Sequence, residues 1–191
     1  MTPDVNVVIS HSEYTVLVVD DVVSNVLLLK VLLTNEKFKV ITAGNGKEAL
    51  SQAVNARPDL ILLDVMMPEM NGFEVAERLK ADSETQHIPI IFLTALNTTA
   101  DIVKGFKVGA NDFISKPFNK EELVIRVTHQ ISLIAAKRII MKQTEELRKI
   151  IMGRDKLYSV IAHDLRSPMG SIKMVLNMLI LSPVSYTHLR A

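Results

Sequence analysis

Residues 60–72 read LILLDVMMPEMNG, an apolar run that ends on Asp64 and is followed by a turn-rich stretch up to Gly72. Leu60–Asp64 has the length and the apolar content of a buried strand. Four more short runs rich in apolar or β-branched residues occur along the chain, at Tyr14–Asp20, Phe38–Ala43, Ile88–Thr94 and Asp112–Ser115. The sequence therefore predicts five strands.

Segments with helical spacing separate these strands. They are Val22–Asn35, Gly46–Asn55, Gly72–Ala81 and Thr98–Val108, each opened or closed by Asn, Gly, Asp or Pro. Strict alternation of strand and helix argues for a parallel sheet that is covered by helices on both faces. The predicted fold class is α/β, a doubly wound five-stranded parallel sheet, with a long helical segment after it.

Polar side chains gather at the predicted carboxyl ends of the strands, where sheets of this type bind their ligands. These residues are Asp20, Asp21, Asp64, Thr94 and Lys116. Three carboxylates at one edge repel each other by about 4 kcal/mol per close pair at an effective dielectric of about 20, unless a cation sits among them. A hard divalent ion with oxygen ligands resolves this repulsion, so the sequence predicts bound Mg²⁺.

The same edge carries groups that suit phosphoryl transfer. An Asp at a strand end, taken alone, is most often a helix cap or a turn former. Here the carboxylates lie together with Lys116 and Thr94, a cation and a hydroxyl donor that can hold phosphoryl oxygens. Their joint placement favours transfer of a phosphoryl group to a carboxylate.

This set of residues resembles the response-regulator receiver family of two-component signalling. The likeness covers about Thr15 to Thr128 and rests on several motifs: the acidic pair Asp20–Asp21, DVMMPEMNG at Asp64–Gly72, LTA at Leu93–Ala95 and KPF at Lys116–Phe118. The resemblance implies a flavodoxin-like fold in which Asp64 accepts the phosphoryl group.

The resemblance also implies roles for the neighbouring residues. Mg²⁺ would be ligated by Asp21, by Asp64 and by the backbone carbonyl of Met66, with Asp20 assisting through water. Thr94 and Lys116 would respond to the phosphate, and Phe113 occupies the aromatic switch position of the family. Phe113 lacks the hydroxyl of a tyrosine, so its switching would depend on ring burial.

From Asn119 onward the strand signals stop, and helix formers continue without proline as far as Pro168. One long helix or two in series are predicted, with an end or a bend near that proline. Six of nine positions on one heptad seam are apolar, the seam being Ala136, Ile140, Gln143, Leu147, Ile150, Arg154, Leu157, Ile161 and Asp164. This spacing predicts a coiled coil and a parallel homodimer.

Residues 158–172 read YSVIAHDLRSPMGSI and resemble the phospho-accepting H-box of histidine kinases. A neutral imidazole is a nucleophile near pH 7, and a neighbouring carboxylate can orient it and take its proton. The resemblance implies that His163 is a second phosphorylation site with Asp164 as its base. Nothing after Ile172 supplies the ATP-binding boxes that such kinases need.

The predicted organisation is a leader (1–13), a receiver domain (14–128), a helical coiled-coil linker (129–157) and the start of a kinase dimerisation and phosphoacceptor domain (158–183). The ending VSYTHLRA (184–191) resembles a translated sequencing adapter and is predicted not to be native. This organisation favours a fragment of a hybrid sensor histidine kinase, whose receiver regulates the kinase core. Its partners would be a second copy and a cognate histidine kinase or phosphotransfer protein.

Composition excludes several other classes. The 22 Lys and Arg residues nearly balance the 21 Asp and Glu residues, so no net field draws the chain to nucleic acid or an anionic membrane. The absence of cysteine excludes disulfides and thiolate metal sites, and with no signal peptide and no apolar span the predicted location is cytoplasmic. No DNA-recognition helix follows the receiver motifs, which leaves a non-enzymatic phosphorylation switch as the alternative to a kinase.

Overall fold

The structure, a computed structural model, describes residues 10–95 and 99–181. The chain divides into two compact units, one ending at Arg138 and the other beginning at Ile139. Within the described ranges, no helix combines the length and the apolar content needed to cross a membrane.

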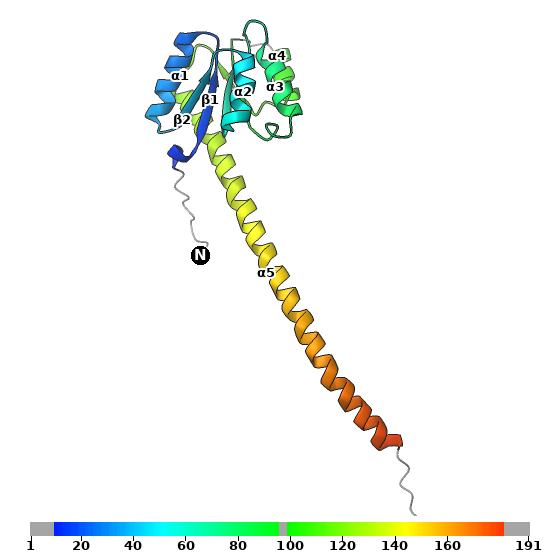
Figure 1. Cartoon of the computed structure of the whole chain (residues 1–191). Helices are drawn as coiled ribbons and strands as arrows, with labels where there is room; N and C mark the ends of the chain where they lie inside the picture. Colours follow the sequence, from blue (N-terminus) through cyan, green and yellow to red (C-terminus); the bar gives the residue numbers. More distant parts are fainter. Residues whose placement is uncertain (1–9, 96–98, 182–191) are drawn as a thin grey trace, which may run out of the picture. The chain divides into compact units, whose positions relative to one another are not determined.

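A five-stranded parallel sheet forms the centre of the first unit (Figure 1). Its strands are β1 (Thr15–Val19), β2 (Lys39–Ala43), β3 (Leu60–Asp64), β4 (Ile90–Thr94) and β5 (Asp112–Ser115). Their order in the sheet is β2-β1-β3-β4-β5, and every pairing is parallel. The predicted α/β fold with a five-stranded parallel sheet is confirmed.

The helices between the strands begin and end close to the predicted residues. They are α1 (Val23–Asn35), α2 (Gly46–Ala56), α3 (Gly72–Ala81) and α4 (Thr99–Lys107). A short 3₁₀ helix, η1 (His11–Glu13), precedes β1, and α5 (Lys120–Leu181) follows β5. Asn71 caps α3, because its side chain accepts a hydrogen bond from the Glu74 backbone while the Glu74 carboxylate accepts one from the Asn71 backbone. This reciprocal pair satisfies two backbone donors and starts α3 at Gly72.

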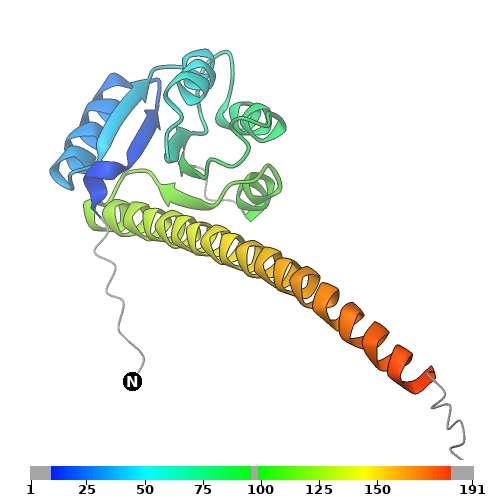
Figure 2. The ribbon, with the colours of Figure 1, turned by 60° about the horizontal axis from the view of Figure 1, so that its bottom comes forward.

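Helices cover both faces of the sheet (Figure 2). On one face Leu17, Ile61 and Leu63 pack with side chains of α2 and α3. On the other face lie side chains of α1 and α5, with Leu60 and Leu62 among their partners. Because β3 is buried on both sides, it reads as a continuous apolar run and not as an alternating one.

The first turns of α5 belong to the first compact unit. Leu123, Val127, Ile131 and Ala135 lie four residues apart and are all buried against the sheet. Three residues after Ala135, Arg138 forms an ion pair with Asp59, and its guanidinium lies 5.4 Å from the centroid of the Tyr14 ring. The compact unit therefore extends to Arg138, past residue 128 where the predicted receiver domain ends.

The second unit, as far as it is described, is the rest of α5. Five apolar residues of the predicted heptad seam are 44–67% exposed in the single chain: Ile140, Leu147, Ile150, Leu157 and Ile161. The predicted end of the helix near Pro168 is wrong, because α5 continues through this residue to Leu181. Proline removes its own backbone donor, which would have paired with the Asp164 carbonyl, and its ring crowds that carbonyl, but α5 is helical on both sides of residue 168. The adapter-like tail and residues 1–9 of the leader lie outside the described residues.

Candidate functional site

Three carboxylates meet at the carboxyl edge of the sheet, as the sequence predicted. Asp20 follows β1 and Asp64 ends β3, and the pairing of Val19 with Leu63 sets these two strands side by side. Asp20 is 1% exposed and Asp64 is 2% exposed, while Asp21 is exposed. One oxygen from each of these three carboxylates lies within 4.8 Å of the others. The register of neighbouring strands thus builds an acidic cluster from residues far apart in sequence.

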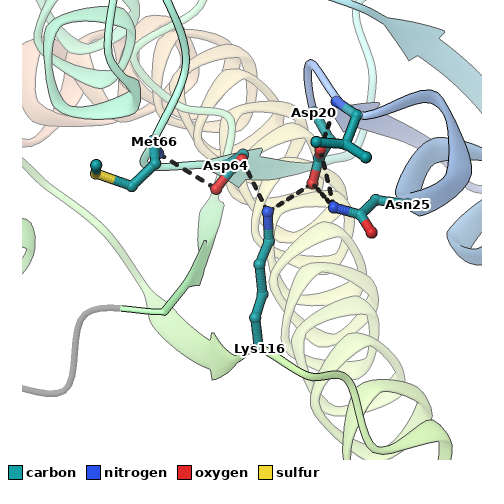
Figure 3. Close-up of polar contacts among 6 residues, drawn as sticks. Asp20, Asn25, Asp64, Met66 and Lys116 are labelled. Carbon is teal, nitrogen blue, oxygen red and sulfur yellow. Dashed lines mark hydrogen bonds and ion pairs between the residues drawn. The ribbon is translucent and has the colours of Figure 1, made fainter.

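Lys116 supplies a cation to this cluster (Figure 3). Its ammonium Nζ lies 2.7 Å from Asp20 Oδ2 and 2.8 Å from Asp64 Oδ2. Three carboxylates against one ammonium still leave an excess of two negative charges at this edge. Lys116 is predicted to hold phosphoryl oxygens, and in this structure it bridges the two buried carboxylates.

Burial and the ion pair between Lys116 and Asp64 act in opposite directions on the pKa of each of these two groups. Desolvation raises the pKa of Asp64 above its ordinary value, and the hydrogen bond and charge of Lys116 oppose that rise without cancelling it. Burial also acts to lower the pKa of Lys116, but hydrogen bonds to Asp20 and Asp64 outweigh it, so this pKa is raised. Lys116 therefore stays a cation at neutral pH, whereas ionised Asp64 depends on its positive neighbours.

Sequence reasoning missed one residue of the site, Asn25. Its Nδ2 donates to both oxygens of Asp20, at 3.1 Å to Oδ1 and 3.0 Å to Oδ2 (Figure 3). The backbone N–H of Val22 donates to the same Oδ1 at 2.9 Å. Asn25 lies in the first turn of α1, where an Asn is ordinarily taken for a capping or surface residue, so only its spacing from Asp20 could have identified it.

The loop after Asp64 folds back closely on the end of β3. The backbone N–H of Met66 donates to Asp64 Oδ1 at 3.3 Å, and that of Gly72 donates to the Val65 carbonyl at 2.9 Å. A Cβ atom at residue 72 would lie 2.2 Å from the Asp64 carbonyl oxygen. Gly72 is therefore required for space, because it lets α3 start directly beside the backbone of Asp64.

Thr94 and Phe113 are the residues predicted to act as a switch, and they lie on β4 and β5. Thr94 ends β4 and is buried, and the preceding residue, Leu93, pairs with Asp64 on β3. Phe113 on β5 is half-buried, with its ring centroid 5.7 Å from that of Phe92 and 4.9 Å from that of Phe106 on α4. The Phe113 ring thus links β5 to β4 and to α4.

The donor set of the acidic cluster fits a hard divalent cation. Mg²⁺ prefers carboxylate and carbonyl oxygens, and the oxygens of Asp20, Asp21 and Asp64 converge at the cluster. These residues would hold the ion, which when bound neutralises negative charge on an incoming phosphoryl group. The carbonyl of Met66 stays a predicted ligand, since only its backbone N–H has a described contact with Asp64.

Residues of α1 form an apolar surface close to the acidic cluster. Val23, Leu27 and Val31 lie four residues apart and are 71%, 57% and 56% exposed. The helix begins three residues after Asp20, so this apolar face starts beside the cluster. An α-helix that is apolar on nearly all sides ordinarily has a partner on each face, which makes α1 a candidate contact surface.

His163 and Asp164 both lie on α5 in the second unit. The imidazole Nδ1 is 3.3 Å from Asp164 Oδ1, and the two side chains are 84% and 72% exposed. The predicted pairing of the imidazole with its neighbouring carboxylate is therefore present. An imidazole with this exposure is open to a reacting group.

Comparisons with known proteins agree with the geometry of the first unit. Residues 16–128 match the family model of the response regulator receiver domain. The response regulator PleD of Caulobacter vibrioides is 46% identical over 134 residues, which are 70% of this chain and 28% of that protein. The DNA-binding response regulator MtrA of Mycobacterium tuberculosis is 46% identical over 112 residues, which are 59% of this chain and 48% of that protein. The chain thus spans less than half the length of these relatives.

Solved structures show the same fold. The chemotaxis protein CheY4 of Vibrio cholerae has a TM-score of 0.59 and 36% sequence identity, and the match covers 61% of this chain and 97% of that one. The signal receiver domain of a signal transduction histidine kinase from Syntrophus aciditrophicus has a TM-score of 0.58 and 35% sequence identity. That match covers 62% of this chain and 90% of the solved one. Both matches cover nearly the whole of the solved domain.

Proposed function

This chain belongs to the response regulator receiver family of two-component signalling, and on that premise we propose that Asp64 accepts a phosphoryl group with the help of Mg²⁺. The observation that carries the proposal is the geometry of Lys116, whose ammonium lies 2.8 Å from Asp64 at an edge with three carboxylates. An acceptor needs a nucleophilic oxygen beside fixed positive charge, and this edge provides both.

In the proposed reaction an ionised oxygen of Asp64 attacks the phosphorus of a phospho-donor. A P–O bond to Asp64 forms, and the bond from phosphorus to the donor's nitrogen or oxygen breaks, so the donor leaves with that electron pair. Lys116 and the hydroxyl of Thr94 then hold oxygens of the transferred group, and Asp20, Asp21 and Asp64 would hold Mg²⁺, which would supply further positive charge. The product is an acyl phosphate on Asp64.

The test uses the whole chain and acetyl phosphate as a small donor. With Mg²⁺ present, intact mass should show the gain of one phosphoryl group, stable in acid and labile in base, because an acyl phosphate hydrolyses in base. EDTA or Asp64→Asn should abolish the gain. Asp82→Asn is the matched control, since Asp82 is exposed at the end of α3, and it should be labelled like the parent. Undiminished labelling of the Asp64→Asn variant would contradict the assignment.

Receiver domains interact with histidine kinases or phosphotransfer proteins, and we propose such a protein as the donor for this chain. A phosphohistidine must reach the edge where Asp64 lies. The exposed apolar face of α1, formed by Val23, Leu27 and Val31, supports the docking of an apolar helix beside that edge.

For the second unit we propose the start of a histidine-kinase dimerisation domain, with His163 as its phosphoacceptor and a homodimer along the heptad seam. The phosphoacceptor domain keeps the boundaries proposed from the sequence, 158–183, and the linker is proposed to begin at Ile139, because residues 129–138 belong to the first compact unit. Support comes from the 3.3 Å contact of His163 with Asp164 and from the exposed apolar seam. The match to a receiver domain that is part of a histidine kinase accords with this arrangement. The alternative is a switch without kinase activity.

A reaction in trans distinguishes these two alternatives. The chain is mixed with labelled ATP and the isolated ATP-binding domain of a related histidine kinase. His163 should gain an acid-labile label, because a phosphoramidate hydrolyses in acid, and His163→Gln should remove it. His129→Gln changes an exposed histidine in the first unit and should leave the label intact. Absence of label from the parent, or label that persists without His163, would favour the switch.

A further inference from the structure

The Asp20 carboxylate is fully occupied by donors of the protein itself (Figure 3). Its Oδ1 accepts from the Val22 backbone and from Asn25, and its Oδ2 accepts from Asn25 and from Lys116. An ionised carboxylate offers about four acceptor positions. A metal ion, or a water bound to it, can therefore engage Asp20 only after one of these donors withdraws.

The donors to Asp20 differ in how easily each can break its hydrogen bond. The Val22 N–H belongs to the backbone at the N-cap of α1 and cannot leave without moving the helix. Lys116 is already shared with Asp64, at 2.8 Å. Asn25 contacts both oxygens from one side-chain nitrogen, at 3.1 and 3.0 Å, which is the place that a chelated cation would occupy. Rotation of its side chain is enough to release an oxygen.

We propose that Asn25 is a positioning residue that holds Asp20 in the ion-free receiver and competes with Mg²⁺ for its Oδ2. When the ion binds, the amide gives up Oδ2 and keeps its hydrogen bond to Oδ1. This inference rests on the proposed function, because it assigns a regulatory role at the same metal site. Asn25 would thereby set the Mg²⁺ affinity of the receiver.

The chemistry of an amide suits this role better than the alternatives. Asp20 is 1% exposed, and a buried carboxylate without donors is strongly disfavoured. A lysine at residue 25 would neutralise the cluster permanently, and an aspartate would add a fourth carboxylate to it. The amide satisfies the oxygens and leaves the negative charge in place, so the cluster stays attractive to a divalent cation.

The test is a calorimetric titration of the full chain with Mg²⁺ at neutral pH, comparing the parent with Asn25→Leu. The variant loses a donor that stabilises the ion-free state more than the ion-bound state. Its Mg²⁺ affinity should therefore rise roughly three- to tenfold, which corresponds to the net contribution of one ordinary hydrogen bond, about 0.7–1.4 kcal/mol. Its midpoint of thermal unfolding in EDTA should fall, and the deficit should shrink at saturating Mg²⁺. Asn25→Ala should show the same changes in Mg²⁺ affinity and thermal midpoint, and it replaces the leucine variant in the test if that variant does not fold.

Asn55→Leu is the matched control. Its amide donates to Ser51 Oγ at 3.2 Å on the exposed face of α2, so Mg²⁺ affinity should not change. If the parent binds Mg²⁺ and the Asn25 variants bind it equally well or more weakly, the proposed role of Asn25 is wrong. The proposed metal site would stand in that case. A parent that binds no Mg²⁺ would overturn the role of Asn25 together with the proposed metal site, while the labelling of Asp64 is tested separately.

Discussion

Gly72→Ala is expected to disrupt the fold around the acidic cluster. The added Cβ would lie 2.2 Å from the Asp64 carbonyl oxygen and 2.9 Å from the Val65 Cα. Both are backbone atoms, so no side-chain rotation relieves the clash, and the start of α3 must move away from β3. The expected loss of stability is about 3 kcal/mol or more, measured by denaturant unfolding. In any fraction that folds, displacement of Asp64 should lower the rate of labelling by acetyl phosphate about a hundredfold.

Gly44→Ala provides a control within the same unit. The nearest atom to a Cβ at residue 44 is the far end of the Glu48 side chain, at 3.7 Å, an ordinary contact. Its stability should stay within about 1 kcal/mol of the parent. Equal unfolding curves for the Gly72 and Gly44 variants would contradict the close approach of α3 to Asp64.

Leu147→Lys combined with Ile150→Lys is expected to convert the chain from a dimer to a monomer. These two residues are 59% and 67% exposed in the single chain and lie on the predicted heptad seam. In a parallel coiled coil they face their counterparts, so two lysines from each copy would place like charges at the buried centre of the interface. Light scattering should give half the mass of the parent at the same concentration.

The control for this variant changes the same helix away from the seam. Met141→Lys combined with Met152→Lys also replaces two exposed apolar residues, but on the outer positions of the heptad. This variant should stay a dimer. A parent that is already monomeric, or equal masses for both double variants, would count against the seam.

Much of the fold could be predicted from the sequence because buried parallel strands carry a strong local signal. Leu60–Asp64 and Asp112–Ser115 were predicted with the observed bounds, and so was α3, whose start is fixed by Asn71 and Gly72. The place where the polar side chains gather followed from topology alone, since the carboxyl ends of parallel strands lie at the same edge of the sheet. Asp20, Asp21 and Asp64 therefore met at the predicted place.

What the sequence could not show depends on side-chain geometry across distant elements. The bridge of Lys116 between two carboxylates, and the two contacts of Asn25 with Asp20, follow from rotamers that no local pattern encodes. The continuation of α5 through Pro168 was also missed, because a proline removes a single donor and a long helix tolerates that loss. Arg138 was missed as well, since its partner Asp59 lies on another element.

The central claim, that Asp64 accepts the phosphoryl group, is tested most directly by locating the group on the chain. The labelled parent is treated with borohydride, which reduces an aspartyl phosphate to homoserine, and its peptides are read by tandem mass spectrometry. Homoserine is expected at residue 64, and unmodified aspartate at residues 20 and 21. Homoserine at either of those two residues, or a labelled chain with aspartate intact at residue 64, would contradict the claim.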